Sequence, residues 1–109
     1  MDQLKIRSIQ TRSFDTGDRK AVLRATVATL QDLGFVVDRA ASDLGTITAT
    51  KLAGYSARTT VTVRPRGAKQ IAVRVSIEHN DRTVEDPQTY QDFFSALGKS
   101  LFLSANQVD

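Results

Sequence analysis

Two neighbouring runs of strictly alternating residues constrain the fold of this chain more than any other feature of its sequence. The runs are residues 58–64 and 70–78, and a Pro-Arg-Gly-Ala sequence typical of a turn lies between them. One face of the two runs carries Thr59, Val61, Val63, Ile71, Val73, Val75 and Ile77. A period of two residues is that of a strand in a sheet with only one buried face. The pattern therefore predicts an antiparallel hairpin whose other face meets solvent.

Two further segments have the spacing of amphipathic helices. The first ends at Gly34, a residue type that often terminates helices, and Asp15 or Thr16 can cap its start. The second begins with Asp86 as the cap and Pro87 at the first helical position. The apolar stripes are Leu23, Thr26, Val27, Leu30 and Leu33 in the first helix, and Tyr90, Phe93, Phe94, Leu97 and Leu101 in the second. One face of the sheet is the surface that both stripes can cover.

Three other segments favour β-strands, and together with the hairpin and the helices they define the fold class. Residues 35–39 and 45–51 flank a turn-forming sequence, and the second of these segments is rich in Thr, which favours strands. Residues 5–14 alternate imperfectly and are expected to form the first strand. The expected order is β-α-β-β-β-β-α. This order describes an α+β domain with a mainly antiparallel sheet of about five strands and two helices on one face, a helix-grip-like fold.

Length and composition indicate one globular domain. The chain has 109 residues, which matches a single domain spanning residues 1–109. Apolar residues make up 40% and charged residues 25%, which is the composition of a globular rather than a disordered protein. Because the chain has no Cys, disulfides, thiolate catalysis and zinc–thiolate sites are excluded. The first residues lack the apolar segment of a signal peptide, so we expect either a cytoplasmic protein or a chain without its targeting segment.

The sequence contains no recognisable catalytic, cofactor or metal site. His79 is the only histidine, and it is expected at the end of a strand beside a polar loop. No serine has the surroundings of a nucleophile elbow. Residues 81–86 lack the alternating Asp and Asn residues and the central Gly of a calcium loop. Residues 15–18 hold one Gly and two acids rather than a phosphate-binding motif. We therefore predict a non-enzymatic domain without cofactor or metal.

Charge is distributed unevenly along the chain, whose net charge is +3. The range 51–74 holds six basic residues and no acid, whereas the range 78–92 holds five acids and one base. A basic region of this kind attracts anionic partners. The candidate partner surface consists of Arg58, Thr60, Thr62, Arg64, Arg66, Lys69 and Arg74. Another protein could cover its Thr-rich part, and the basic hairpin from Arg58 to Arg74 could alternatively contact nucleic-acid phosphates.

Several motifs resemble those of small uncharacterised lipoproteins of Gram-negative bacteria. They are Thr-Arg-Ser-Phe-Asp-Thr at residues 11–16, Leu-Gln-Asp-Leu-Gly-Phe at 30–35 and Leu-Gly-Thr-Ile-Thr-Ala-Thr-Lys at 44–51. The C-terminal part of the sequence also resembles the end of the same kind of domain. The residues that carry this resemblance are Asp86, Pro87, Tyr90, Phe93, Phe94, Leu101, Phe102 and Leu103. The expected element order is also similar to that of the helix-grip domains of the BamC-type lipoprotein, a component of the outer-membrane β-barrel assembly machinery.

This resemblance implies a non-enzymatic domain with a structural or protein-interaction role, whose partner is another envelope protein. The domain would be periplasmic and would contact the outer membrane only through a lipidated N-terminal Cys. The present sequence has no Cys. A sequence that starts just after that Cys, with Met1 added, would explain the difference, and residues 1–6 would be the remnant of a flexible tether. The less favoured alternative is a small cytoplasmic domain that binds nucleic acid, because the exposed face carries Thr, Ala and Ser rather than aromatics on which bases stack.

Overall fold

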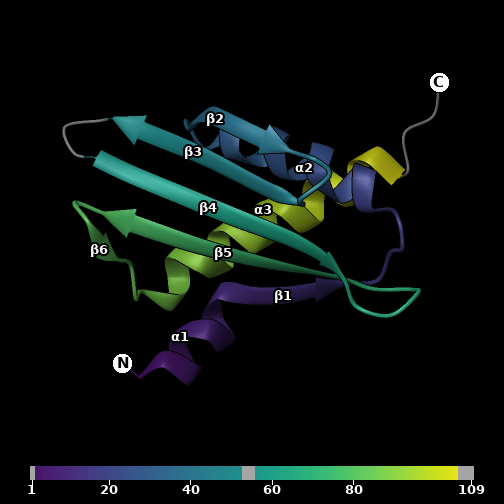
Figure 1. Ribbon diagram of the computed structural model, residues 1–109, viewed down its shortest axis with the longest axis horizontal. Coiled ribbons are helices and arrows are strands. Elements are labelled where there is room, and N and C mark those ends of the chain that lie inside the picture. The colour runs from purple at the N-terminus through teal and green to yellow at the C-terminus, as the bar shows by residue number, and fades with distance from the viewer. Residues whose placement is uncertain (1, 53–55, 106–109) are drawn as a thin grey trace.

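The computed structural model describes residues 2–52 and 56–105, so Met1 of the expected tether lies outside the described residues (Figure 1). The helices are α1 (Gln3–Gln10), α2 (Arg19–Asp32) and α3 (Pro87–Ala105). The strands are β1 (Thr11–Phe14), β2 (Val36–Ala41), β3 (Thr46–Leu52), β4 (Ser56–Pro65), β5 (Ile71–His79) and β6 (Arg82–Thr83). The fold is α+β with one open antiparallel sheet, as the sequence predicts.

Five of the six described strands follow one another across the sheet in the order β1-β5-β4-β3-β2. Every pair is antiparallel, and β6 pairs with the end of β5 that β1 leaves uncovered. The predicted hairpin is formed by β4 and β5, which are paired from Ala57 opposite His79 to Pro65 opposite Ile71. The segments 35–39 and 45–51 also form a hairpin, made of β2 and β3. The sheet therefore has one more strand than expected because the two-residue β6 joins its edge.

The prediction of a strand over residues 5–14 is wrong for most of the segment, which belongs to α1. The Asp2 carboxylate accepts a hydrogen bond from the Lys5 backbone N–H at 2.9 Å and caps this helix. Ile6 and Gln10 are buried and lie four residues apart, so they share one helix face. Only β1 follows as a strand. Ile6, which lies within the expected tether, is thus packed against the rest of the domain.

α2 begins one turn later than the predicted cap. Its N-cap is Asp18, whose carboxylate accepts from the Ala21 backbone N–H at 3.0 Å, so the prediction of Asp15 or Thr16 as the cap is wrong. The Thr16 hydroxyl instead accepts from the Asp18 N–H. Gly34 follows the helix with a φ of +91°, a conformation that favours glycine and that confirms the predicted end. The buried side chains of α2 are Val22, Leu23, Ala25, Thr26, Thr29 and Leu30.

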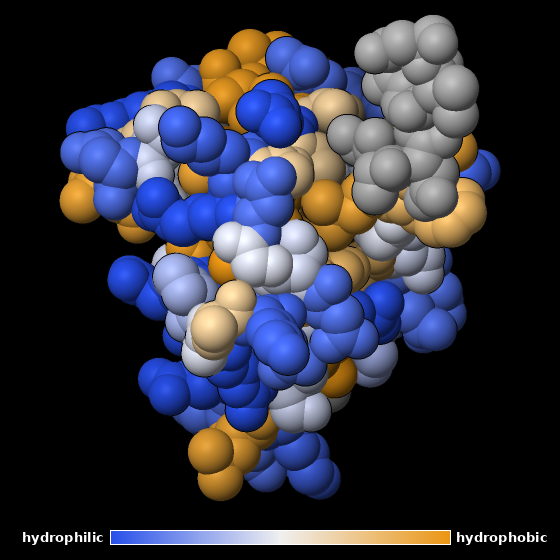
Figure 2. All heavy atoms as spheres, turned by 90° about the vertical axis from the view of Figure 1, so that its right-hand side faces the viewer, coloured by the Kyte–Doolittle hydropathy of each residue, from blue (hydrophilic) through white to orange (hydrophobic). Residues whose placement is uncertain are grey.

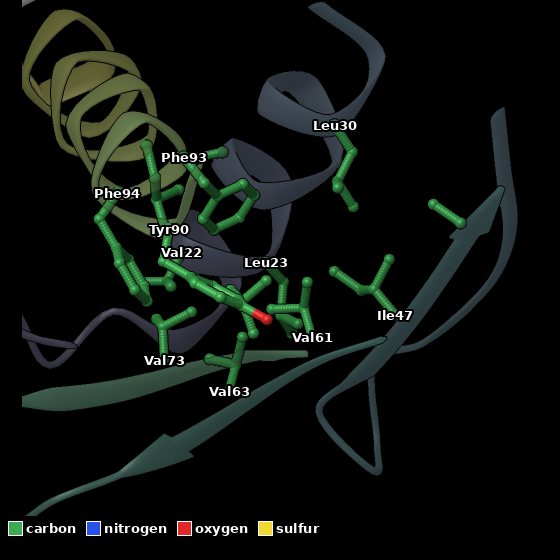
Figure 3. Close-up of a cluster of buried hydrophobic side chains, with 14 of the residues drawn as sticks. Val22, Leu23, Leu30, Ile47, Val61, Val63, Val73, Tyr90, Phe93 and Phe94 are labelled. Carbon is green, nitrogen blue, oxygen red and sulfur yellow. The ribbon is translucent and has the colours of Figure 1, made fainter. Parts of the chain in front are cut away.

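α2 and α3 lie on the same side of the sheet and enclose the core with it (Figure 1). As predicted, Asp86 caps α3, since its carboxylate accepts from the Gln88 backbone N–H at 3.1 Å. The buried residues of α3 are Tyr90, Phe93, Phe94 and Leu97, and Leu101 is half-buried. In Figure 3, Phe93 from α3 and Leu30 from α2 point into the space between the two helices and the sheet. The valines and isoleucines of β4 and β5 complete this core.

Candidate binding surface

The face of the sheet opposite α2 and α3 presents most of the predicted partner surface. Alternation along β4 buries Thr59, Val61 and Val63 against the helices and turns the residues between them to the other side. We call this other side the outer face. It carries Thr46, Thr48 and Thr50 of β3, Arg58, Thr60, Thr62 and Arg64 of β4, and Ala72, Arg74, Ser76 and Glu78 of β5. Five of the seven predicted site residues therefore share this face.

Short hydroxyl side chains occupy the centre of the outer face because of the strand register. Thr60 lies opposite Ser76 on one neighbouring strand and opposite Thr48 on the other. The next row pairs Thr62 with Arg74 and with Thr46. These Thr and Ser residues are half-buried by their neighbours, whereas Arg58, Arg64 and Arg74 are exposed. The centre of the outer face is therefore a shallow area of short hydroxyl side chains, bordered by longer guanidinium side chains.

Arg39 of β2 is a further cation of the outer face, which the sequence pattern does not indicate. It lies opposite Thr48, because the register of β2 shifts at a bulge between Val37 and Arg39. Simple alternation from Val37 would place Arg39 on the helix side, so no local pattern indicates its true direction. The displaced Asp38 carboxylate accepts a hydrogen bond from the Thr50 hydroxyl at 2.6 Å.

The two remaining predicted residues, Arg66 and Lys69, lie in the turn between β4 and β5. The Arg66 guanidinium donates to the Ser13 hydroxyl at 3.2 Å. Ser13 is paired with Ala72, an outer-face residue, so Arg66 reaches back to the outer face at the end that carries Arg64. Lys69 is exposed in the turn. Figure 2 faces this end of the molecule, and hydrophilic residues make up most of the described surface in that view.

The composition of the outer face suits an acidic partner with hydrogen-bonding groups. Guanidinium groups present several N–H donors in a planar arrangement that matches carboxylates. The Thr and Ser hydroxyls between them can donate or accept. Two acids share the face: Glu78 lies opposite Arg58, and Asp38 is bonded to Thr50. Basic residues therefore outnumber acids, and the excess lies toward the end of the β4–β5 hairpin that carries Arg64 and Arg74.

The groups considered for catalysis lie apart from this surface. His79, at the end of β5, is exposed. Within residues 2–52 and 56–105, no three His, Asp or Glu side chains come close enough together to hold a metal ion.

No helix in the described part of the chain is both long and apolar enough to cross a membrane.

Comparison of the sequence with models of protein families and with curated proteins yields no match.

Proposed function

We propose that this domain is a non-enzymatic binding module that docks an acidic surface of another protein on its outer face. The observation that carries the proposal is the register of β3, β4 and β5, which brings Thr60, Thr62 and Ser76 together between exposed arginines. A low polar centre allows close approach of a partner, and the surrounding charges steer an acidic one. The five predicted residues that share the outer face act here together with Arg39, and Arg66 reaches the same face from the turn.

A protein is favoured over a nucleic acid as the partner. The outer-face residues of β3, β4 and β5 that the structure describes include no aromatic side chain on which a base could stack. A protein surface can place neutral or basic groups opposite Glu78 and Asp38, whereas a nucleic acid carries a negative charge at every phosphate. Nucleic-acid binding is the alternative that the experiment must separate from this proposal.

The proposed setting is the bacterial cell envelope, where the domain would be held at the outer membrane by a lipid anchor. Its support is the resemblance of residues 11–16, 30–35 and 44–51 to small lipoproteins of Gram-negative bacteria. The gene sequence upstream of Met1 tests this setting. A signal peptide that ends in small residues and Cys would support it, whereas a native start at Met1 without an upstream signal would contradict it.

Charge reversal on the outer face tests the docking proposal. We expect a short peptide of alternating Glu and Ser to bind the domain, more tightly than a single-stranded oligothymidylate of equal net charge. The double variant Arg64→Glu and Arg74→Glu should weaken peptide binding by about tenfold, which corresponds to roughly 1.4 kcal/mol. Titration calorimetry at two salt concentrations provides the measurement, and binding should weaken as salt rises.

The matched control reverses Lys20 and Lys99, which are exposed on α2 and α3. Lys20→Glu with Lys99→Glu changes the net charge equally but lies away from the outer face, so it should change affinity much less. Equal losses in both double variants would show general charge attraction and contradict the proposal. Tighter binding of the oligothymidylate would favour the nucleic-acid alternative.

A further inference from the structure

A cleft of about 630 Å³ opens on the helix side of the sheet, opposite the outer face. It lies where the last turn of α2 and the first turns of α3 meet the inner face of β4 and β5. Its buried wall is mainly apolar and includes Leu30, Ala57, Ile77 and Phe93. Figure 3 shows Leu30 and Phe93 pointing toward the sheet from the two helices. The volume lies within the roughly 300–1,000 Å³ of small-molecule sites.

One polar side chain in this wall has no hydrogen-bond partner. Thr59 is only 1% exposed, and its hydroxyl oxygen is unpartnered within the described structure. Its neighbours across the sheet are Ala49 and Ile77, whose side chains cannot hydrogen-bond. The buried hydroxyls of Thr26 and Thr29, in contrast, each donate to a helix carbonyl at 2.8 Å. A buried hydroxyl without a partner is unfavourable, so a ligand atom that reaches the Thr59 oxygen when the side chains around it move aside would be stabilised there.

Charged groups at the mouth of the cleft are engaged within the fold. The Lys51 ammonium donates to the Leu33 carbonyl oxygen at 2.9 Å. Asp86 accepts from the Gln88 backbone N–H, and Asp92 accepts from the Gln88 side-chain amide at 2.7 Å. Two carboxylates therefore stand beside one ammonium, and a ligand that carries a negative charge gains little at this mouth.

We propose that this cleft binds an uncharged, mainly apolar small molecule whose single hydroxyl or carbonyl oxygen hydrogen-bonds to the Thr59 hydroxyl. The apolar wall takes up the body of the ligand, and Thr59 fixes the orientation of its polar end. The inference is independent of protein docking on the outer face, because Thr59 and Thr60 are successive residues of β4 that point to opposite sides of the sheet.

Titration with 1-octanol, followed by amide ¹H–¹⁵N chemical shifts, tests the proposal. The domain should show saturable shifts at residues 57–59, 77–79 and 93, and octanoate should bind more weakly than 1-octanol. Thr59→Val keeps the side-chain volume but removes the hydroxyl, so it should weaken 1-octanol binding by about fivefold. The same variant should melt at the same temperature as the parent domain or higher, because an unsatisfied buried hydroxyl is lost.

The control is Thr60→Val, which removes a hydroxyl from the outer face of the same strand and should leave 1-octanol affinity unchanged. Ala57→Leu provides a second test, since the larger side chain occupies part of the cleft and should weaken 1-octanol binding, whereas Ala72→Leu on the outer face should not. The proposal fails if shifts do not saturate, if octanoate binds more tightly, or if Thr59→Val binds 1-octanol as the parent does. A lower melting temperature for Thr59→Val would show that its hydroxyl has a partner within the fold.

Discussion

The hydroxyl group of Tyr90 connects α1, β5 and the segment that precedes α3. It donates to the Val84 carbonyl oxygen at 2.6 Å and accepts from the Ile77 backbone N–H at 3.3 Å. It also accepts from the side-chain amide of Gln10 at 3.2 Å. Tyr90 and Gln10 are both buried, so each of these polar groups depends on the others for its hydrogen bonds. The same network attaches α1 to the sheet and to α3.

Tyr90→Phe should therefore destabilise the domain although it keeps the aromatic ring. We expect the free energy of unfolding to fall by about 1–3 kcal/mol, because the buried Gln10 amide and the Ile77 N–H lose their partner. Urea denaturation monitored by circular dichroism measures this change. Removing Gln10 first should reduce the effect of Tyr90→Phe, and an unchanged urea midpoint in the single variant would contradict the network.

The hairpin of β2 and β3 is joined to β4 through its turn. Gly45 in this turn has a φ of +69°, and its carbonyl oxygen accepts from the Val63 N–H at 2.7 Å. A side chain at Gly45 would collide with the backbone carbonyl of Val63. Gly67, in the turn of the β4–β5 hairpin, has a similar φ of +73°, but a Cβ atom there would meet no other atom within 4 Å. The two glycines thus have similar φ angles but differ in how closely the rest of the chain packs on them.

Alanine substitution at both glycines separates these two effects. Gly67→Ala should lower the free energy of unfolding by about 1–2 kcal/mol, the cost of the left-handed conformation for an L-residue. Gly45→Ala should cost about 3 kcal/mol, since the Val63 carbonyl must also move. Thermal and urea denaturation of the two variants give the comparison. Equal losses would show that the Gly45 turn does not pack on β4.

The whole domain depends on one core between the inner face of the sheet and the two long helices. Phe94 is central to it: its ring lies 5.5 Å from that of Phe93 and 6.4 Å from that of Phe14. The Arg12 guanidinium covers the Phe94 ring at 5.0 Å. Phe93, in contrast, borders the cleft. The two neighbouring phenylalanines therefore contribute to different regions of the inner side.

Phe94→Ala should cost about 3–5 kcal/mol, because it leaves a cavity in the packed core. Total stability of a domain is about 5–15 kcal/mol, so this variant is expected to lose a large part of its stability and to melt at a much lower temperature. Phe93→Ala should cost less, since the space it leaves joins the existing cleft. Differential scanning calorimetry measures both melting temperatures. Unchanged melting temperatures in both variants would contradict the assignment of α3 to the core.

Neighbouring residues alone were sufficient to predict the parts of the fold whose pattern repeats locally. Alternation over residues 58–64 and 70–78 correctly assigned each side chain to the inner or outer face, and hence five of the seven candidate site residues. Helical spacing predicted the buried stripe of α3, and Gly34 marked the end of α2. These features follow from backbone geometry, which repeats every two residues in a strand and every 3.6 in a helix.

Contacts between segments that are distant in sequence determined the features that local patterns did not predict. The spacing of the apolar residues around Ile6 is compatible with either a short strand or a helix. The helix α1 forms because Ile6 and Gln10 are buried beside α3 and β5. The direction of Arg39 depends on a bulge, and the unpartnered hydroxyl of Thr59 depends on which residues lie opposite it across the sheet. Alternation in one strand determines which face a residue occupies. It carries no information about what lies across from that residue, and burial and hydrogen bonding depend on those neighbours.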